Sequence, residues 1–194
     1  QYLVTEYINM CDELKAVYDG AVNTVRMIVF KKDGKNPQIG NAYVRFGSKK
    51  TGAVDNVGAG GMTATIDVAT GHFHDAKIVL NNSIEDCPIH PDTGVPIDGY
   101  LPHWEQVKQQ VLDVTKSIKQ LEFFGVDLAV TNDGIKFPEI NRFPDYPAVE
   151  KYTKPTREYL LYKLAGKKHH YGYDVTPNKT LVHLPKRDSE RGKS

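Results

Sequence analysis

A β-hairpin predicted within residues 125–147 constrains the fold of this chain more than any other stretch. The turn sequence Asn-Asp-Gly at 132–134 lies between two apolar, β-prone runs, which is typical of a tight hairpin loop. If the hairpin is symmetric about its central Asp, Asp127 lies directly opposite Glu139. Asn141 then points to the same side, because side chains alternate along a strand. The sequence therefore predicts two carboxylates and an amide on one face.

These two carboxylates need a positive charge between them. Directly opposed residues have β carbons roughly 4.5 to 5.5 Å apart, where like charges repel. We expect both faces of the hairpin to be buried, since its other side chains are mostly apolar: Val126, Leu128, Ala129, Val130, Phe137 and Ile140. Oxygen donors from Asp, Glu and Asn suit Mg²⁺ better than zinc, so we predict a magnesium site. The alternative is an exposed hairpin with incidental polar residues.

Composition narrows the class of protein. The formal net charge is +1, so no overall field favours nucleic acid or a membrane surface. No apolar run approaches the roughly 18 residues of a membrane span, and no leader opens the chain, so we expect a cytoplasmic protein. Cys11 and Cys87 are too few for a disulfide framework and are expected to be buried or partly buried thiols. A strand-like start without Met predicts that the chain is part of a longer protein.

The remaining pattern predicts an α+β fold with an antiparallel β-sheet and flanking helices. Strands are expected at 1–8, 24–30, 40–46, 62–68 and 72–80, in addition to the hairpin. A loop with a short helical turn is expected at 9–22, a polar turn at 31–38, a Gly-rich loop at 49–61 and a long surface loop at 81–99. Helices are predicted from Pro102, with an apolar stripe of Trp104, Val107, Val111, Val114, Ile118 and Leu121, and over about 156–164. The polar tail 185–194 is expected to be disordered.

Two strand arginines are candidates for an anion site. Arg26 and Arg45 lie in neighbouring predicted strands, and guanidinium groups suit phosphate oxygens. The equally weighted alternative is that each points to solvent or to an acidic partner. The Gly-rich run 56–61 precedes a strand rather than a helix, so it is not the dinucleotide fingerprint, but it could hold phosphate through backbone N–H groups.

Histidines offer a weaker signal. His72 and His74 share a strand face, but zinc would need a third ligand that the sequence does not specify. His90 lies in the long loop, where contact with substrate is the more plausible use, and Asp92 is included with it as a candidate substrate residue.

Taken together, these motifs resemble those of the ATP-grasp superfamily of ligases, in matching order over about residues 1–150. The resemblance implies adenine contacts at the hinge segment and metal ligands at Asp127, Glu139 and Asn141. It implies that Arg26, and with it Arg45, acts on the phosphates as a catalytic residue. The implied nucleotide-binding residues are Glu6, Tyr7, Ile8, Asp12, Glu13, Asn56, Gly60 and Gly61. The segment 90–104 resembles the sugar-transfer associated ATP-grasp subfamily, whose members are inferred to act near polysaccharide or cell-envelope biosynthesis.

The resemblance implies an ATP- and Mg²⁺-dependent ligase that joins a small-molecule or sugar-linked carboxylate to an amine-type nucleophile through an acyl phosphate. It also divides the chain into an ATP-grasp portion at 1–150, a helical extension at 151–184 and the tail. The family's ATP-holding lysines precede the hinge strand and are missing here, so the fragment should bind nucleotide weakly and not turn over. Two alternatives remain: a non-catalytic nucleotide-binding or scaffolding module, and a carbohydrate-binding module. The second would need exposed aromatic rings, whereas Trp104 lies on the apolar stripe of the predicted helix.

Overall fold

The computed structural model describes residues 7–32, 35–80, 83–142, 144, 154, 157 and 158. The chain divides into two compact units, residues 1–145 and residues 146–194. In the second unit, the described residues Lys154, Arg157 and Glu158 are helical. The rest of the helix predicted at 156–164 and the whole tail lie outside the described residues.

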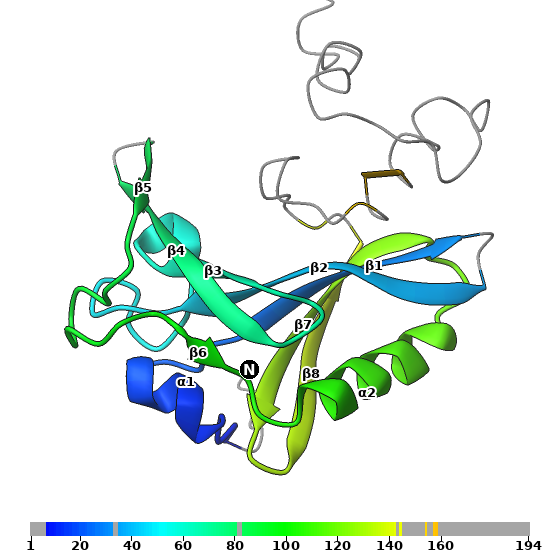
Figure 1. Cartoon of the computed structure of the whole chain (residues 1–194), viewed down its shortest axis with the longest axis horizontal. Helices are drawn as coiled ribbons and strands as arrows, with labels where there is room; N and C mark the ends of the chain where they lie inside the picture. Colours follow the sequence, from blue (N-terminus) through cyan, green and yellow to red (C-terminus); the bar gives the residue numbers. More distant parts are fainter. Residues whose placement is uncertain are drawn as a thin grey trace, which may run out of the picture. The chain divides into compact units, whose positions relative to one another are not determined.

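The first unit is built on an antiparallel β-sheet (Figure 1). Its strands are β1 (Val25–Lys32), β2 (Asn36–Phe46), β3 (Met62–Ile66), β4 (His72–Leu80), β5 (Ser83–Asp86), β6 (Gly99–Tyr100), β7 (Phe123–Thr131) and β8 (Gly134–Asn141). The strand order is β5-β4-β3-β2-β1-β7-β8, with β6 paired to β4. The described helices are α1 (Asp12–Val17), α2 (Trp104–Lys116) and a 3-10 turn, η1 (Val57–Ala59). The prediction of an antiparallel sheet with few helices is confirmed.

One face of the sheet carries the hydrophobic core, and α2 packs against β2 and β8. The predicted helical stripe is buried at Trp104, Val107 and Val111. The indole N–H of Trp104 donates to the carbonyl of Val68 at 2.9 Å, which satisfies its polar atom. Val114 is 41% exposed, and the helix ends at Lys116, so the predicted stripe is too long.

The β7–β8 hairpin has the predicted opposition of Asp127 and Glu139. Its symmetry differs, however, because Thr131 pairs with Gly134 and Ala129 pairs with Lys136 across a two-residue loop. A β-bulge between Asp127 and Ala129 then shifts the register by one residue.

The prediction that both faces of the hairpin are buried is wrong for β8. Among the strands that the structure describes, β8 ends the strand order, so it pairs with a described strand on one side only. Glu139 is exposed and Ile140 is 41% exposed, whereas Val126, Leu128 and Val130 on β7 are buried. The burial pattern therefore follows the position of each strand in the sheet.

Two predicted loops and the predicted opening strand also differ from the structure. The segment 81–99 is not one long loop, since it includes β5, the start of β6 and an isolated bridge between Ile89 and Pro96. The polar turn is shorter than 31–38, because β1 continues to Lys32 and β2 begins at Asn36. Residues 1–6 of the expected opening strand lie outside the described residues, and residues 7 and 8 are not in a strand.

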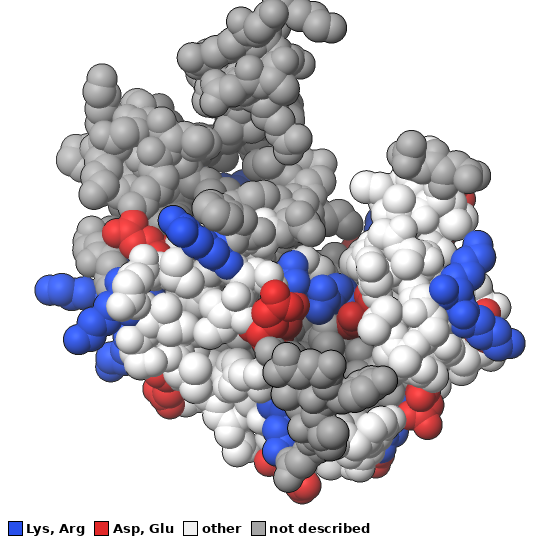
Figure 2. All heavy atoms as spheres, turned by 180° about the vertical axis from the view of Figure 1, so that it is seen from behind, with Lys and Arg blue, Asp and Glu red and all other residues white. Residues whose placement is uncertain are grey.

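The distribution of charged residues on the surface and the burial of the two cysteines agree with what composition predicts. Lysines, arginines, aspartates and glutamates are interspersed on the face seen in Figure 2. Within the described residues, no helix has the length and apolar character needed to cross a membrane. Cys11 is buried and Cys87 is partly buried, and neither forms a disulfide, as predicted.

Candidate functional site

A row of polar side chains runs across the sheet on the face opposite the core. Consecutive pairs in the strand registers join Glu139, Asp127, Arg26, Tyr43, Thr65 and His74. Directly paired residues point to the same side of a sheet, so the row lies on one face. A second row on this face joins Arg45, Thr63, Lys77 and Asp86. We call this surface the polar face.

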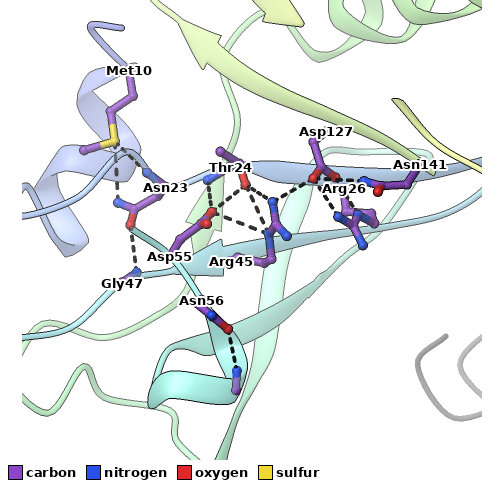
Figure 3. A network of polar contacts seen from close by, with 11 residues as sticks. Met10, Asn23, Thr24, Arg26, Arg45, Gly47, Asp55, Asn56, Asp127 and Asn141 are labelled. Carbon is purple, nitrogen blue, oxygen red and sulfur yellow. Dashed lines mark hydrogen bonds and ion pairs between the residues drawn. The ribbon is translucent and has the colours of Figure 1, made fainter. Parts of the chain in front are cut away.

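Arg26 and Asp127 form the centre of the polar face (Figure 3). Arg26 Nε lies 2.5 Å from Asp127 Oδ1, and Nη2 lies 2.6 Å from Oδ2. Arg26 is 7% exposed and Asp127 is 3% exposed, so water screens this two-point ion pair weakly. Arg45 Nη2 also donates to Asp127 Oδ2, at 3.0 Å. Two arginines therefore supply the positive charge that the carboxylates require.

Arg45 connects this pair to a second carboxylate. Its Nε and Nη2 donate to the hydroxyl oxygen of Thr24 at 3.1 and 2.5 Å, and Nε lies 3.5 Å from Asp55 Oδ2. Asp55 in turn accepts hydrogen bonds from the backbone N–H of Thr24, at 2.9 Å, and from its hydroxyl. Sequence reasoning missed Thr24 and Asp55. Asp55 directly precedes the Gly-rich run, which was the available signal.

Tyr43 is the other residue that sequence reasoning missed. It is the register partner of Arg26 on β2, and strand alternation from Arg45 would have placed it on the same face. Burial raises the pKa of Tyr43, so the phenol is neutral near pH 7. Burial alone would lower the pKa of Arg26, but its hydrogen bonds to Asp127 and Tyr43 and the negative charge of Asp127 raise it above its ordinary value. Arg26 is therefore a permanent cation.

The three predicted metal ligands converge on one another. Asn141 Nδ2 lies 3.3 Å from Asp127 Oδ2. With its amide turned over, Asn141 donates to Glu139 Oε1 at 2.9 Å and accepts from Arg26 Nη2 at 3.0 Å. Gly125 faces Asn141 on β7, and a β carbon there would lie 2.8 Å from the β carbon of Pro144, so the close approach of Pro144 favours glycine.

This donor set fits Mg²⁺ in its chemistry, because it consists of carboxylate and amide oxygens. Both oxygens of Asp127 already accept hydrogen bonds from guanidinium groups. A cation at Asp127 would therefore share these oxygens with the guanidinium groups. Within the described part of the chain, no three His, Cys, Asp or Glu side chains come together as a metal-binding group. The magnesium site stays a prediction.

The Gly-rich run 56–61 forms a tight turn over η1. Asn56 Oδ1 accepts from the backbone N–H of Gly58 at 3.0 Å. Gly60 has φ of +105°, which favours glycine. A β carbon on Gly61 would lie 2.8 Å from the carbonyl oxygen of Phe46. Backbone conformation and close packing therefore account for glycine at positions 60 and 61. Asp55, which directly precedes this turn, forms an ion pair with Arg45.

Of the other predicted nucleotide-binding residues, those that the structure describes form no hydrogen bond or ion pair with this cluster. Glu6 is outside the described residues, Tyr7 is 82% exposed and Ile8 is half-buried. Asp12 and Glu13 form the first turn of α1. The backbone N–H of Asp12 donates to the side chain of Asn132 at 3.1 Å, so α1 begins beside the tip of the β7–β8 hairpin.

His90 and Asp92 hold loops together. His90 is fully buried, its ring stacks on Tyr18, and its Nε2 lies 2.9 Å from the carbonyl of Gly47. Asp92 accepts from the backbone N–H of Lys49 at 2.7 Å. Neither residue contacts the Arg26–Asp127 pair, so their predicted role as substrate residues stays a prediction.

Comparison with known families assigns the chain to one of them. The family described as sugar-transfer associated ATP-grasp matches residues 1–148. The match covers most of the chain, and the protein belongs to this family. The resemblance inferred from the sequence motifs is thereby confirmed. No curated protein and no solved structure matches the chain.

Proposed function

We propose that the polar face binds the phosphates of ATP with Mg²⁺ and that the protein is an ATP-dependent ligase. The observation that carries the proposal is the convergence of Asp127, Glu139 and Asn141 beside Arg26 and Arg45, within a chain of the ATP-grasp family. Carboxylates that hold a cation next to arginines that bind phosphate oxygens are the parts that phosphoryl transfer requires.

Each residue of the cluster has a role in this proposal. Asp127, Glu139 and Asn141 would hold the cation, which offsets charge that develops on the transferred phosphoryl group. Arg26 is buried and permanently charged, so it would orient the γ-phosphate without titrating. Arg45 would stabilise the oxyanion that forms when a nucleophile attacks the activated carboxylate.

The proposed reaction has two steps. A carboxylate oxygen of the substrate attacks the γ-phosphorus, the bond to the bridging oxygen of ADP breaks, and an acyl phosphate forms. An amine-type nucleophile then attacks the acyl carbon, phosphate leaves and the amine loses a proton. The description of the family as sugar-transfer associated favours a sugar-linked substrate, and we propose that its reacting group is a carboxylate and that the setting is polysaccharide or cell-envelope biosynthesis.

The test, made on the full-length protein, is ADP and phosphate release over a panel of acidic sugars and amino acids, together with calorimetric titration of ADP with and without Mg²⁺. We expect Mg²⁺-dependent nucleotide binding and release with one carboxylate class. Nucleotide binding that is indifferent to Mg²⁺ and to the substitution Arg26→Lys would contradict the proposed site.

A non-catalytic nucleotide-binding or scaffolding module is the second candidate. It is favoured by the closed ion pairs of Asp127, whose oxygens are both held by guanidinium groups. Such a module would bind nucleotide and release no ADP with any member of the panel, whereas the ligase would release it.

A further inference from the structure

Three rings stack at the far end of the polar face. The ring of Tyr100 on β6 stacks on His72 with a centroid distance of 4.7 Å, and His72 stacks on His74 at 4.9 Å. Tyr100 is 61% exposed, and the side chains of His72 and His74 are 30% and 32% exposed. We call these three residues the ring stack. Because stacked rings cover each other's faces, the part of the stack that is most exposed to solvent is the ring of Tyr100.

The ring stack shares its face with the Arg26–Asp127 pair. Phe73, between the two histidines, points into the core and is 1% exposed, so alternation directs His72 and His74 to the polar face. His74 pairs with Thr65, Thr65 with Tyr43, and Tyr43 with Arg26. Neighbouring strands lie about 4.8 Å apart, so three steps put the ring stack about 14 Å from Arg26.

A bulge in β4 maintains this arrangement. Between the pairs of Thr63 with Lys77 and Thr65 with His74, β4 contains one additional residue. Asp75 there adopts φ of +51°, which is uncommon for a residue other than glycine and is over-represented at functional sites. The bulge lets His74 and Lys77 both point to the polar face while Ala76, 3% exposed, stays in the core.

Acceptors for hydroxyl groups surround the rings. Asp98 Oδ1 lies 3.1 Å from His72 Nε2, and Asp75 Oδ2 lies 3.1 Å from His74 Nδ1. The side chains of Asp98 and Asp75 are 62% and 71% exposed, so their remaining oxygens can accept hydrogen bonds from a ligand. An aromatic plane flanked by carboxylates complements a pyranose ring, which has an apolar C–H face and a rim of hydroxyl groups.

We propose that the ring stack is a subsite for a sugar ring of the substrate, with the exposed ring of Tyr100 as its platform, His72 as the ring that supports Tyr100, and Asp98 and Asp75 as hydroxyl acceptors. This inference adds a substrate class to the proposed function. It rests on that function, because the proposed phosphate site at Arg26 determines which end of the substrate lies there. The carboxylate to be activated would lie near Arg26, and the sugar ring about three strands away. The substrate class is therefore a glycosylated carboxylate that spans both ends of the polar face.

The experiment measures sugar binding without ATP turnover. Glucuronic acid, galacturonic acid, glucose and galactose are titrated into the whole chain, with saturation-transfer difference NMR to detect the bound C–H face and imidazole proton shifts to locate it. We expect saturable binding that shifts the His72 and His74 signals. Tyr100→Ala should weaken it by about tenfold, whereas Tyr100→Phe, which keeps the ring, should retain it.

A matched pair of variants controls for folding. His72→Asn should reduce binding, whereas His103→Asn, on an exposed histidine outside the stack, should not. No saturable binding of any of the four sugars, or equal loss in both variants, would overturn the subsite. Adenosine binding at the stack with greater affinity than the sugars would overturn it as well, in favour of a nucleobase platform.

Nucleotide binding is measured in the same samples, so the two proposals fail separately. Tyr100→Ala is expected to leave Mg²⁺-dependent ADP binding unchanged, and Arg26→Lys is expected to leave sugar binding unchanged. Sugar binding without nucleotide binding would count against the proposed function alone, and the reverse result against the subsite alone.

Discussion

Arg26 donates hydrogen bonds to both carboxylate oxygens of Asp127 on the neighbouring strand, from Nε to Oδ1 at 2.5 Å and from Nη2 to Oδ2 at 2.6 Å. Both side chains are nearly excluded from water. Arg45 binds one of the same oxygens at 3.0 Å. The carboxylate that we propose as a cation ligand thus pairs with two arginines.

The first prediction concerns the stability of this pair. Arg26→Met leaves the buried carboxylate of Asp127 with Arg45 alone and should lower the free energy of unfolding by about 3 kcal/mol. Urea unfolding followed by circular dichroism measures the loss. The control is Lys108→Met, which breaks a surface pair with the 82% exposed Glu105 and should cost at most about 0.5 kcal/mol. Equal losses in the two variants would mean that the buried ion pair stabilises the fold no more than the surface pair does.

The second prediction separates cation binding from folding. Asp127→Asn removes the charge that compensates two arginines, so it should destabilise the fold as well as the site. Glu139 is exposed, so Glu139→Gln should change the unfolding free energy by about 0.5 kcal/mol or less. It should nevertheless weaken binding of Mn²⁺, used as a spectroscopic substitute for Mg²⁺, by about tenfold or more.

Electron paramagnetic resonance of free Mn²⁺ measures this binding. Glu85→Gln, on an exposed carboxylate of β5, is the matched control and should bind the ion as the wild type does. If Glu139→Gln and the wild type bound Mn²⁺ equally, Glu139 would not be a ligand.

Local pattern was sufficient to predict the hairpin. The observed two-residue loop alone would place Asp127 opposite Pro138, and the β-bulge restores the predicted pairing of Asp127 with Glu139. The bulge near Asp127 has no such signal, because one extra residue in a strand leaves hydrophobic alternation almost unchanged over a short run. The family motifs were also readable from sequence, since their order is a one-dimensional property.

Long-range neighbours could not be predicted in the same way. Arg26 and Asp127 are 101 residues apart, and nothing local states that β1 lies beside β7. Two alternatives for Arg26, an anion site and an acidic partner, therefore remained open. The exposure of Glu139 likewise depends on β8 being at the end of the strand order, which is a property of the assembled sheet.

The third prediction concerns the Gly-rich turn beside Asp55. Gly61→Ala places a β carbon 2.8 Å from the carbonyl oxygen of Phe46 and 2.9 Å from that of Asn56. Backbone atoms cannot move aside at little cost, so the variant should lose about 1 to 3 kcal/mol of stability. Gly58→Ala in the same turn meets only the Asn56 side chain, at 3.4 Å, and should fall within about 0.5 kcal/mol of the wild type. Thermal unfolding of both variants tests this, and comparable melting temperatures would contradict it.

The last prediction concerns the reactivity of the two thiols. Burial raises the pKa of Cys11 to about 11, so its thiolate is scarce in the folded protein at pH 8. Burial also raises the pKa of Cys87, but that thiol is partly exposed and accessible to reagent. With Ellman's reagent at pH 8, Cys87 should react first, and Cys11 only at the rate at which the fold opens.

The Cys87→Ser variant isolates the slow phase, which should become fast in urea. Since the folded state favours the neutral thiol of Cys11, its contribution to stability is complete below pH 9 and is lost as the pH rises from 9 to about 11. Two equal fast phases in the native protein would show that Cys11 is accessible, contrary to its burial between α1 and the sheet, where its backbone N–H donates to the carbonyl of Val130 at 2.8 Å.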